Sequence, residues 1–203
     1  YPYAEVISGY TSFFLGVRSV CPDATMEVKY TNSWASFDLE KEAADALISD
    51  GCVLISQHAD TTGAPTACEA AGVPCVGYNI SMIATAPTQA LTSSTNNWGA
   101  YVTEAVQHVV DGTEIPVDWC KGFSDGAVLI TELNEAAVAP GTKEKVEEVE
   151  AKLAAGELHV FDPSTWTVEG KTLDSYKKDD GNEYISDGYF HESEFASAPA
   201  FDI

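Results

Sequence analysis

Hydrophobic positions in the first half of the chain alternate between helical and strand-like spacing. Apolar residues three and four positions apart predict a helix over 3–20, which a Cys-Pro-Asp turn ends. Short apolar or alternating runs predict strands over 26–30, 52–56, 74–78 and 91–93. Further helices are predicted over 38–49 (with Asp38 as its cap), 62–71 and 98–110. This alternation predicts βαβ units with right-handed crossovers, and therefore an α/β fold with a parallel sheet flanked by helices.

The second half of the chain has weaker periodicity. An apolar run predicts a strand over 126–133, and a charged stretch with a narrow apolar stripe predicts a helix over 142–155. A further short strand is predicted over 158–161. The residues after 162 are turn-rich and aromatic, which favours an extended tail that wraps over a core.

Charge narrows the classes of partner. Ten Lys and Arg stand against 32 Asp and Glu, for a net charge of -22. Such a chain repels nucleic acid at long range, so no nucleic-acid partner is expected. The sequence holds no apolar run of about 18 residues, the length that a membrane-spanning helix needs. It opens with Tyr-Pro-Tyr-Ala and without Met, so we expect a processed or truncated product whose export signal lies upstream.

Familiar catalytic and cofactor motifs are missing. The five cysteines form no Cys-x-x-Cys pair, which argues against a zinc ribbon, and we expect most of them to be buried thiols. The sequence has no phosphate-binding Gly-rich loop, no dinucleotide turn and no nucleophile elbow. We therefore expect no cofactor, no metal site and no catalytic residue of these classes.

Polar loops follow three of the predicted strands. They are 31–34, 57–61 and 79–82. Because ligands of open α/β sheets bind at the carboxyl ends of the strands, these loops are expected to meet at one binding edge.

His58 and Asp60 allow three interpretations. They form a metal or acid/base pair, or they belong to a polar edge loop that bonds a ligand or closes a hinge. In the third interpretation Asp60 or Thr61 caps the helix that follows. The loop interpretation is favoured, because no second His lies nearby in the sequence.

Two tryptophans and three short polar residues complete the candidate ligand site. Trp34 either gives a planar ligand a stacking face or packs on its own following helix. Trp98, at a helix start, is expected to pack in the core more than to bind, and Asn97 is the better ligand contact. Asn79 and Ser81 either bond ligand hydroxyls or hold a turn.

The motifs around these loops resemble a known family. The stretches are EVISGYTSFFLGVRSV (5–20), the strand ending in Asn-Ser-Trp (32–34), DGCVLISQHADT (50–61), Gly-Tyr-Asn (77–79), and Leu-Thr-Ser (91–93) with Asn-Trp-Gly (97–99). In this order they are similar to the basic membrane protein (BMP) family of ABC-transporter substrate-binding lipoproteins. The resemblance runs to about Phe161, and the family includes receptors for purine nucleosides.

The resemblance implies a periplasmic-binding-protein-like fold of two three-layer α/β/α lobes. It implies that residues 1–115 are the second ligand-binding lobe and that 116–157 are a crossover and returning segment normally associated with a first lobe missing here. Residues 158–203 would form an extended tail that packs on the lobe. The chain departs from the family at Ala35 and Ser36, which replace an aromatic residue and an Asp, and at Asn79 and Ser81, where two Asp are common.

The function that the resemblance implies is binding without catalysis. The protein would capture a nucleoside-like ligand outside the cell membrane, be anchored there by an N-terminal lipid not present in this chain, and deliver its ligand to an ABC permease. The expected ligand residues are Trp34, His58, Asp60, Asn79, Ser81, Asn97 and Trp98. A ligand-sensing module of a transcriptional regulator and a nucleoside hydrolase that uses His58 and Asp60 are the alternatives.

Overall fold

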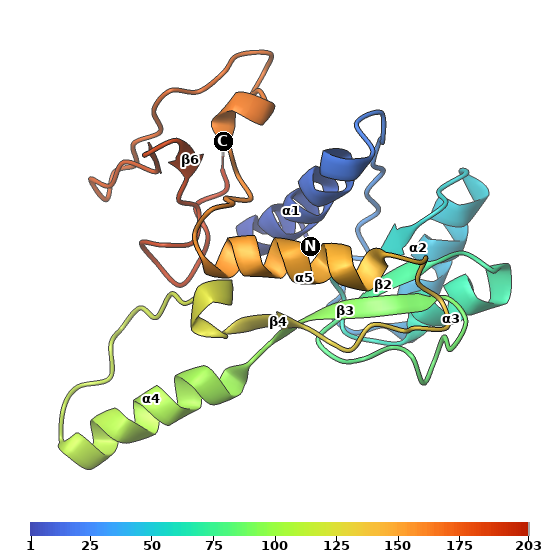
Figure 1. Cartoon of the computed structure of the whole chain (residues 1–203), viewed down its shortest axis with the longest axis horizontal. Coiled ribbons are helices and arrows are strands. Elements are labelled where there is room, and N and C mark those ends of the chain that lie inside the picture. Colours follow the sequence, from blue (N-terminus) through green and yellow to red (C-terminus); the bar gives the residue numbers. More distant parts are fainter. Residues whose placement is uncertain (203) are drawn as a thin grey trace.

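The computed structural model describes residues 1–202, and a four-stranded sheet lies at its centre. The strands are β1 (Ile55–Ser56), β2 (Cys75–Tyr78), β3 (Ala90–Asn96) and β4 (Val128–Ile130), in that spatial order. The helices are α1 (Ala4–Val20), α2 (Phe37–Ser49), α3 (Gly63–Ala71), α4 (Trp98–Asp111) and α5 (Thr142–Ala154). Two short 3₁₀ helices, η1 (Phe123–Asp125) and η2 (Pro163–Thr165), and the two-stranded sheet of β5 (Ile185–Ser186) and β6 (Tyr189–Phe190) complete the chain. Figure 1 shows α2 and α3 grouped beside β1 and β2, with α1 and α5 on the other side of the molecule.

The main core lies between the sheet and the α2–α3 pair. Its buried residues are mostly small, namely Ala44, Ile55, Ala64, Ala67, Cys68, Cys75, Met82, Ala86 and Ala90. Small side chains let the two helices and the strands approach closely, and burial of their apolar surface stabilises the layers. Because β1 and β2 are parallel, the polar loops that follow them leave the sheet at one edge, as the sequence predicts.

The sheet is mixed, because β4 is antiparallel to β3 whereas β1, β2 and β3 are parallel. The register pairs Asn96, at the end of β3, with Val128, at the start of β4. The chain returns beside the end of β3, so β4 has to run back along it.

Two predicted strands are absent from the described residues. The segments 26–30 and 158–161 lack ladder partners, and Val28, Tyr30, Leu158 and Val160 are exposed. Alternating hydrophobicity reports side-chain preference, but a strand also needs a neighbour for its backbone bonds. The strand predicted over 52–56 is reduced to Ile55–Ser56, because residues 50–54 form the turn and bend after α2.

Two smaller expectations need correction. Helix α2 begins at Phe37, and its cap is Ser36, whose hydroxyl accepts from the Leu39 amide at 3.5 Å, so Asp38 lies inside the first turn. All five cysteines are free thiols, but only Cys68 and Cys75 are buried. Cys52 is half-buried, because it precedes the shortened strand.

The C-terminal segment builds a second, aromatic core. Phe161, Tyr184, Ile185, Phe190 and Ala200 are buried together, and Leu15 of α1 packs against them. The Ser8 hydroxyl of α1 donates to the Glu192 carboxylate at 3.1 Å. The tail therefore packs on α1 around a core of its own, and not only as an extended covering.

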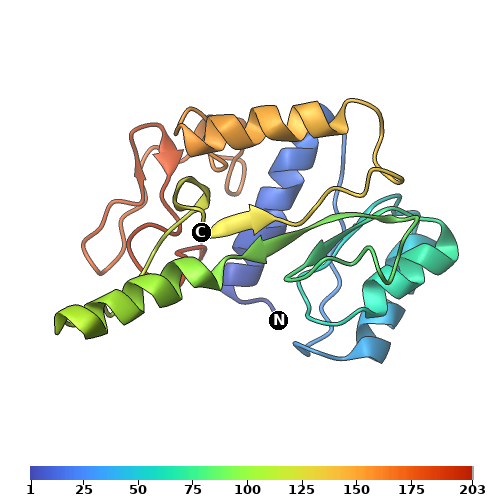
Figure 2. The same cartoon turned by 60° about the horizontal axis from the view of Figure 1, so that its bottom comes forward.

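Helix α4 projects from the body of the molecule in both views (Figures 1 and 2). Its residues Trp98, Val102, Val106, Val109 and Val110 form one apolar stripe, and each side chain is more than half exposed. On the other face of α4, the Trp119 indole N–H donates to Glu104 at 3.0 Å, and the Trp119 ring lies 5.3 Å from that of Tyr101. Within the described residues, no helix is both long and apolar enough to cross a membrane.

Candidate functional site

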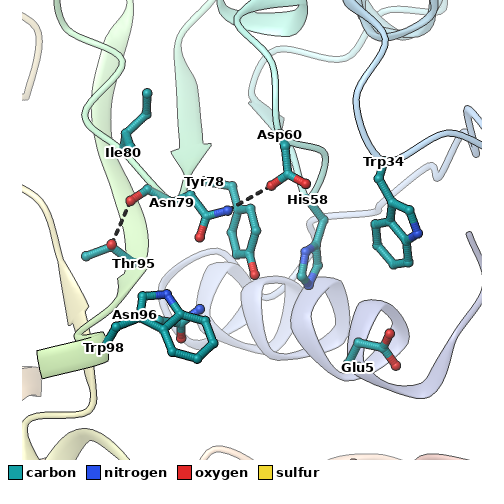
Figure 3. A pocket seen from close by; sticks show the side chains of 10 residues that line it. All are labelled: Glu5, Trp34, His58, Asp60, Tyr78, Asn79, Ile80, Thr95, Asn96 and Trp98. Atoms are coloured by element: carbon teal, nitrogen blue, oxygen red, sulfur yellow. Dashed lines mark hydrogen bonds between the residues drawn. The ribbon is translucent and has the colours of Figure 1, made fainter. Parts of the chain in front are cut away.

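A cavity of about 450 Å³ lies at the carboxyl ends of β1, β2 and β3. The first turn of α1 and the start of α4 close its sides. The lining residues, drawn in Figure 3, are Glu5, Trp34, His58, Asp60, Tyr78, Asn79, Ile80, Thr95, Asn96 and Trp98. This is the edge of the sheet that the polar loops predict.

Five of the seven predicted ligand residues line this cavity, and two do not. Trp34, His58, Asp60, Asn79 and Trp98 are brought together. Ser81 instead donates to the Glu132 carboxylate at 2.8 Å. Asn97 caps α4, because its side-chain oxygen accepts from the Gly99 amide and its amide nitrogen donates to the Gly126 carbonyl.

Trp34 and Trp98 stand at opposite ends of the cavity (Figure 3). The Trp34 ring lies 5.1 Å from the Tyr1 ring and 5.8 Å from the Tyr3 ring, between centroids. Trp98 is 68% exposed, so the expectation that it packs in the core is wrong. It begins a helix that leaves the body of the protein, and therefore no core is within its reach.

Asn79 and Asp60 form the polar centre of the site. The Asn79 side-chain nitrogen donates to the Asp60 carboxylate at 2.8 Å (Figure 3). Asn79 is in the left-handed backbone region (φ 66°), which Asn tolerates better than most residues. The backbone carbonyl of Asn79 accepts from the Thr95 hydroxyl at 2.6 Å, and its backbone N–H donates to the Ser94 carbonyl at 2.8 Å. One side-chain and two backbone hydrogen bonds thus hold Asn79 in place at the end of β2.

The loop that carries His58 and Asp60 is held from below by a buried carboxylate. Glu40 of α2 accepts from the Thr61 amide, the Thr61 hydroxyl and the Ser36 amide. Gln57 donates to the Ala59 and Thr61 carbonyls. Thr61 also accepts from the Gly63 amide at the start of α3, as the capping interpretation proposes. The loop is therefore preorganised by its own hydrogen bonds.

His58 packs between the sheet and α1. Its ring centroid lies 4.6 Å from that of Tyr78, and a Cβ atom placed on Gly9 of α1 would collide with the imidazole. Its Nδ1 atom is buried and has no hydrogen-bond partner among residues 1–202. The carboxylate of Asp60 is bonded to Asn79. The described residues contain no cluster of three His, Cys, Asp or Glu placed to hold a metal ion.

Five of the residues that line the cavity were not among those expected from the sequence. Tyr78, Thr95 and Asn96 lie at strand ends, and β3 extends three residues beyond the predicted strand, so the last two were missed. Ile80 was missed inside a polar loop, and Glu5 inside a helix with no loop to mark it. Burial raises the pKa of the Tyr78 hydroxyl, a hydrogen bond from Asn96 opposes this, and the Asp60 and Glu5 carboxylates raise it further.

The arrangement is suited to holding a small molecule. Two indole rings offer faces for a planar or ring-shaped ligand, and such contacts contribute about 0.5–1.5 kcal/mol beyond area burial. Between them, the Asp60 and Asn79 side chains offer acceptors and a donor in fixed positions. Apolar walls with a few directed polar groups are typical of ligand pockets.

Comparison with known proteins identifies similar sequences. The family model Bmp, described as ABC transporter substrate-binding protein PnrA-like, matches residues 1–160. A purine-binding protein of Brucella abortus (strain 2308) is 33% identical over 187 residues, which cover 92% of this chain and 50% of that protein. A protein of Haloferax volcanii, provisionally named an ABC transporter glucose-binding protein, is 31% identical over 83% of this chain and 43% of its own. The chain thus spans about half the length of these relatives.

Solved structures share the fold at low sequence identity. An ABC transporter solute-binding protein from Conexibacter woesei superposes with a TM-score of 0.62 and 20% identity, over 78% of this chain and 53% of that one. A transcriptional activator from Bacillus halodurans gives a TM-score of 0.57 and 16% identity, over 64% and 47%. The α/β fold of periplasmic-binding-protein type is therefore established, and this fold serves more than one function.

Proposed function

Because the chain belongs to the family of PnrA-like ABC transporter substrate-binding proteins, we propose that it is the ligand-capturing part of an ABC importer. It binds a small polar ligand of the purine nucleoside class outside the cell membrane and delivers it to a permease. The main observation in support of this proposal is the cavity in which Trp34 and Trp98 flank the hydrogen-bonded Asp60–Asn79 pair. A purine ring stacks on an indole face, and the pair bonds its sugar hydroxyls or ring nitrogens.

The site works by binding and not by chemistry. The Asp60 carboxylate is engaged by Asn79, and the His58 ring lies against Tyr78 and Gly9. In an acid/base site the base is itself oriented by a hydrogen bond to a third group, and His58 Nδ1 has no such partner in residues 1–202. These contacts support His58 as a residue that shapes the wall. They give no support to a nucleoside hydrolase, which would release free base from adenosine on incubation with the protein.

A second lobe completes the site in this proposal. Residues 1–115 supply one wall, 116–157 cross toward the other lobe and return, and the tail that begins at residue 158 packs back on α1. The proposal is supported by the length of the relatives, about twice the matched segment, and by the open apolar stripe of α4. Trp98 belongs both to the stripe and to the cavity wall, so a body packed on α4 also faces the ligand. Hinge closure of two lobes then encloses the ligand.

The anchoring and the partner follow from the same proposal. A lipid on an upstream segment holds the protein at the outer face of the membrane, and the permease receives the ligand from the closed form. A transcriptional sensor is disfavoured, because the family match to transporter proteins covers residues 1–160, whereas the likeness to the activator is one of fold.

Thermal-shift measurement with a panel of purines, purine nucleosides and hexoses tests the proposal. A ligand at about 100 times its dissociation constant adds about 2.7 kcal/mol of stability, which raises the melting temperature measurably. A shift with at least one purine or purine nucleoside is expected. A folded protein that responds to no member of the panel would remove the purine assignment.

A further inference from the structure

Glu5 gives the cavity a second carboxylate, and it comes from a different element than Asp60. Glu5 is the one lining residue that α1 contributes, and Asp60 lies in the loop after β1. Figure 3 places Glu5 on the helix below Trp34 and His58. Within residues 1–202, its carboxylate makes no ion pair and no side-chain hydrogen bond, whereas Asp60 is engaged by Asn79. The Glu5 oxygens are therefore free to accept hydrogen bonds from a ligand.

An acidic residue in a first helical turn has an ordinary role, because it stabilises the positive end of the helix dipole. That role does not require the side chain to line a cavity, and Glu5 does so. The fields of Glu5 and Asp60 also converge, since both carboxylates act on the Tyr78 hydroxyl at the cavity wall. The two charges are thus part of one site.

No Lys or Arg side chain among the described residues lines the cavity beside these two carboxylates. Proteins that bind phosphate groups use Arg or Lys side chains, or free amides at a helix start. Two helix starts lie at the cavity. The Gly99 amide of α4 is capped by Asn97. At α1, where Tyr3 gives no side-chain cap, the first turn carries the negative charge of Glu5 itself. A ligand phosphate would lose water on entering and would meet two carboxylates.

We propose that Glu5 is a specificity-determining residue that restricts the site to ligands without negative charge. The preferred ligand is uncharged, or carries a positive charge, and presents hydroxyl or N–H donors to Glu5, because an ionised carboxylate accepts and does not donate. Phosphorylated forms of the same ligand are rejected by repulsion from Glu5 and Asp60. This inference rests on the proposed function, and it names the charge class of ligand that the site takes.

Paired ligands that differ by one phosphate test it. Dissociation constants are measured by calorimetry for adenosine and adenosine 5′-monophosphate, and for glucose and glucose 6-phosphate. The proteins compared are the wild-type chain, Glu5→Gln, and Glu42→Gln, which removes the same charge from an exposed position of α2 outside the cavity. The wild type is expected to prefer the uncharged member of the pair it binds by at least ~10-fold. Glu5→Gln narrows this preference several-fold, and Glu42→Gln leaves it unchanged.

Salt separates a charge effect from a structural one. Raising sodium chloride from about 0.05 to about 0.5 M shortens the screening length and should narrow the wild-type preference more than that of Glu5→Gln. Equal affinity for both members of a pair, or an unchanged preference in Glu5→Gln, overturns the inference while the proposed function stands. If the folded wild type binds neither adenosine nor glucose, the purine and sugar assignment fails first, and the inference fails with it.

Discussion

The backbone of Gly9 on α1 lies against the imidazole ring of His58, so that a single methyl group at position 9 would collide with Nε2 and Cδ2 of that ring. This contact seats α1 on the loop after β1. It also sets where Glu5, one helical turn earlier, stands relative to Asp60. The position of α1 and the shape of the ligand site are therefore linked through one glycine.

Replacing Gly9 by Ala should destabilise the fold and disturb the site. The new Cβ forces the His58 ring or α1 to move, and overpacking of this kind costs about 1–3 kcal/mol. Gly16→Ala is the matched control in the same helix, because a Cβ there meets open space. It should stabilise the helix by about 0.5–1 kcal/mol. Urea unfolding of both variants checks this, and equal effects would refute the contact.

Glu40 should be far more sensitive to substitution than its neighbour Glu42. Glu40 is 3% exposed and satisfies two amides and one hydroxyl, from Ser36 and Thr61. Glu40→Ala leaves these donors without a partner and should cost about 2–4 kcal/mol. Glu42 is exposed on the same helix, and Glu42→Ala should stay within about 0.5 kcal/mol of wild type. Thermal unfolding measures both, and similar losses would contradict the bracing role of Glu40.

Glu192 should make the attachment of the tail depend on pH. Burial raises the pKa of its carboxyl above the ordinary 4.5, while hydrogen bonds from Ser193 and Ser8 oppose the rise. A carboxyl with a higher pKa in the folded chain holds its proton more tightly when folded. The stability that this proton binding adds to the folded chain is therefore complete below about pH 4.5, and it is lost as pH rises through the pKa of the folded state.

Glu192→Gln removes this dependence while its side-chain oxygen can still accept from Ser8. Relative to wild type, the variant should gain stability as pH rises from about 4 to 8. Exposed Glu157 provides the control substitution, Glu157→Gln, which should keep the wild-type profile. The measurement is the melting temperature of wild type and both variants at several pH values between about 4 and 8. A constant difference between Glu192→Gln and wild type would show that the carboxyl does not titrate differently on folding.

The apolar stripe of α4 should matter only when a second lobe is present. Val106 is 55% exposed, so Val106→Lys should change the stability of the 203-residue chain by no more than about 0.5 kcal/mol. In a two-lobed protein the same change buries a charge and should cost about 2 kcal/mol or more. Gln107→Lys, off the stripe, should be tolerated in both. Equal effects of Val106→Lys in the two proteins would contradict the proposed interface.

The helices and the binding edge were predictable because both depend on local order in the sequence. Apolar spacing marks α1, α3 and α4 to within one residue, and the polar loops after β1 and β2 mark the edge with Asp60 and Asn79. Trp34 also reaches this edge, although the strand predicted before it is absent. The contribution of Glu5 depends on how α1 crosses the site, which periodicity does not encode. The sequence did not predict that Trp98 is exposed or that segment 26–30 forms no strand. Both depend on which parts of the chain lie beside these residues in space.

Direct titration of the folded protein with a purine nucleoside tests the central claim, that ligand binds in the cavity between Trp34 and the Asp60–Asn79 pair. Calorimetry should give saturable one-to-one binding, and Trp34→Ala and Asn79→Ala should each weaken it at least ~10-fold, the factor that corresponds to about 1.4 kcal/mol. Trp119→Ala and Asn182→Ala remove the same residue types outside the cavity and should bind as wild type does. Binding that survives both cavity substitutions unchanged, or no binding by the folded wild type, would contradict the account.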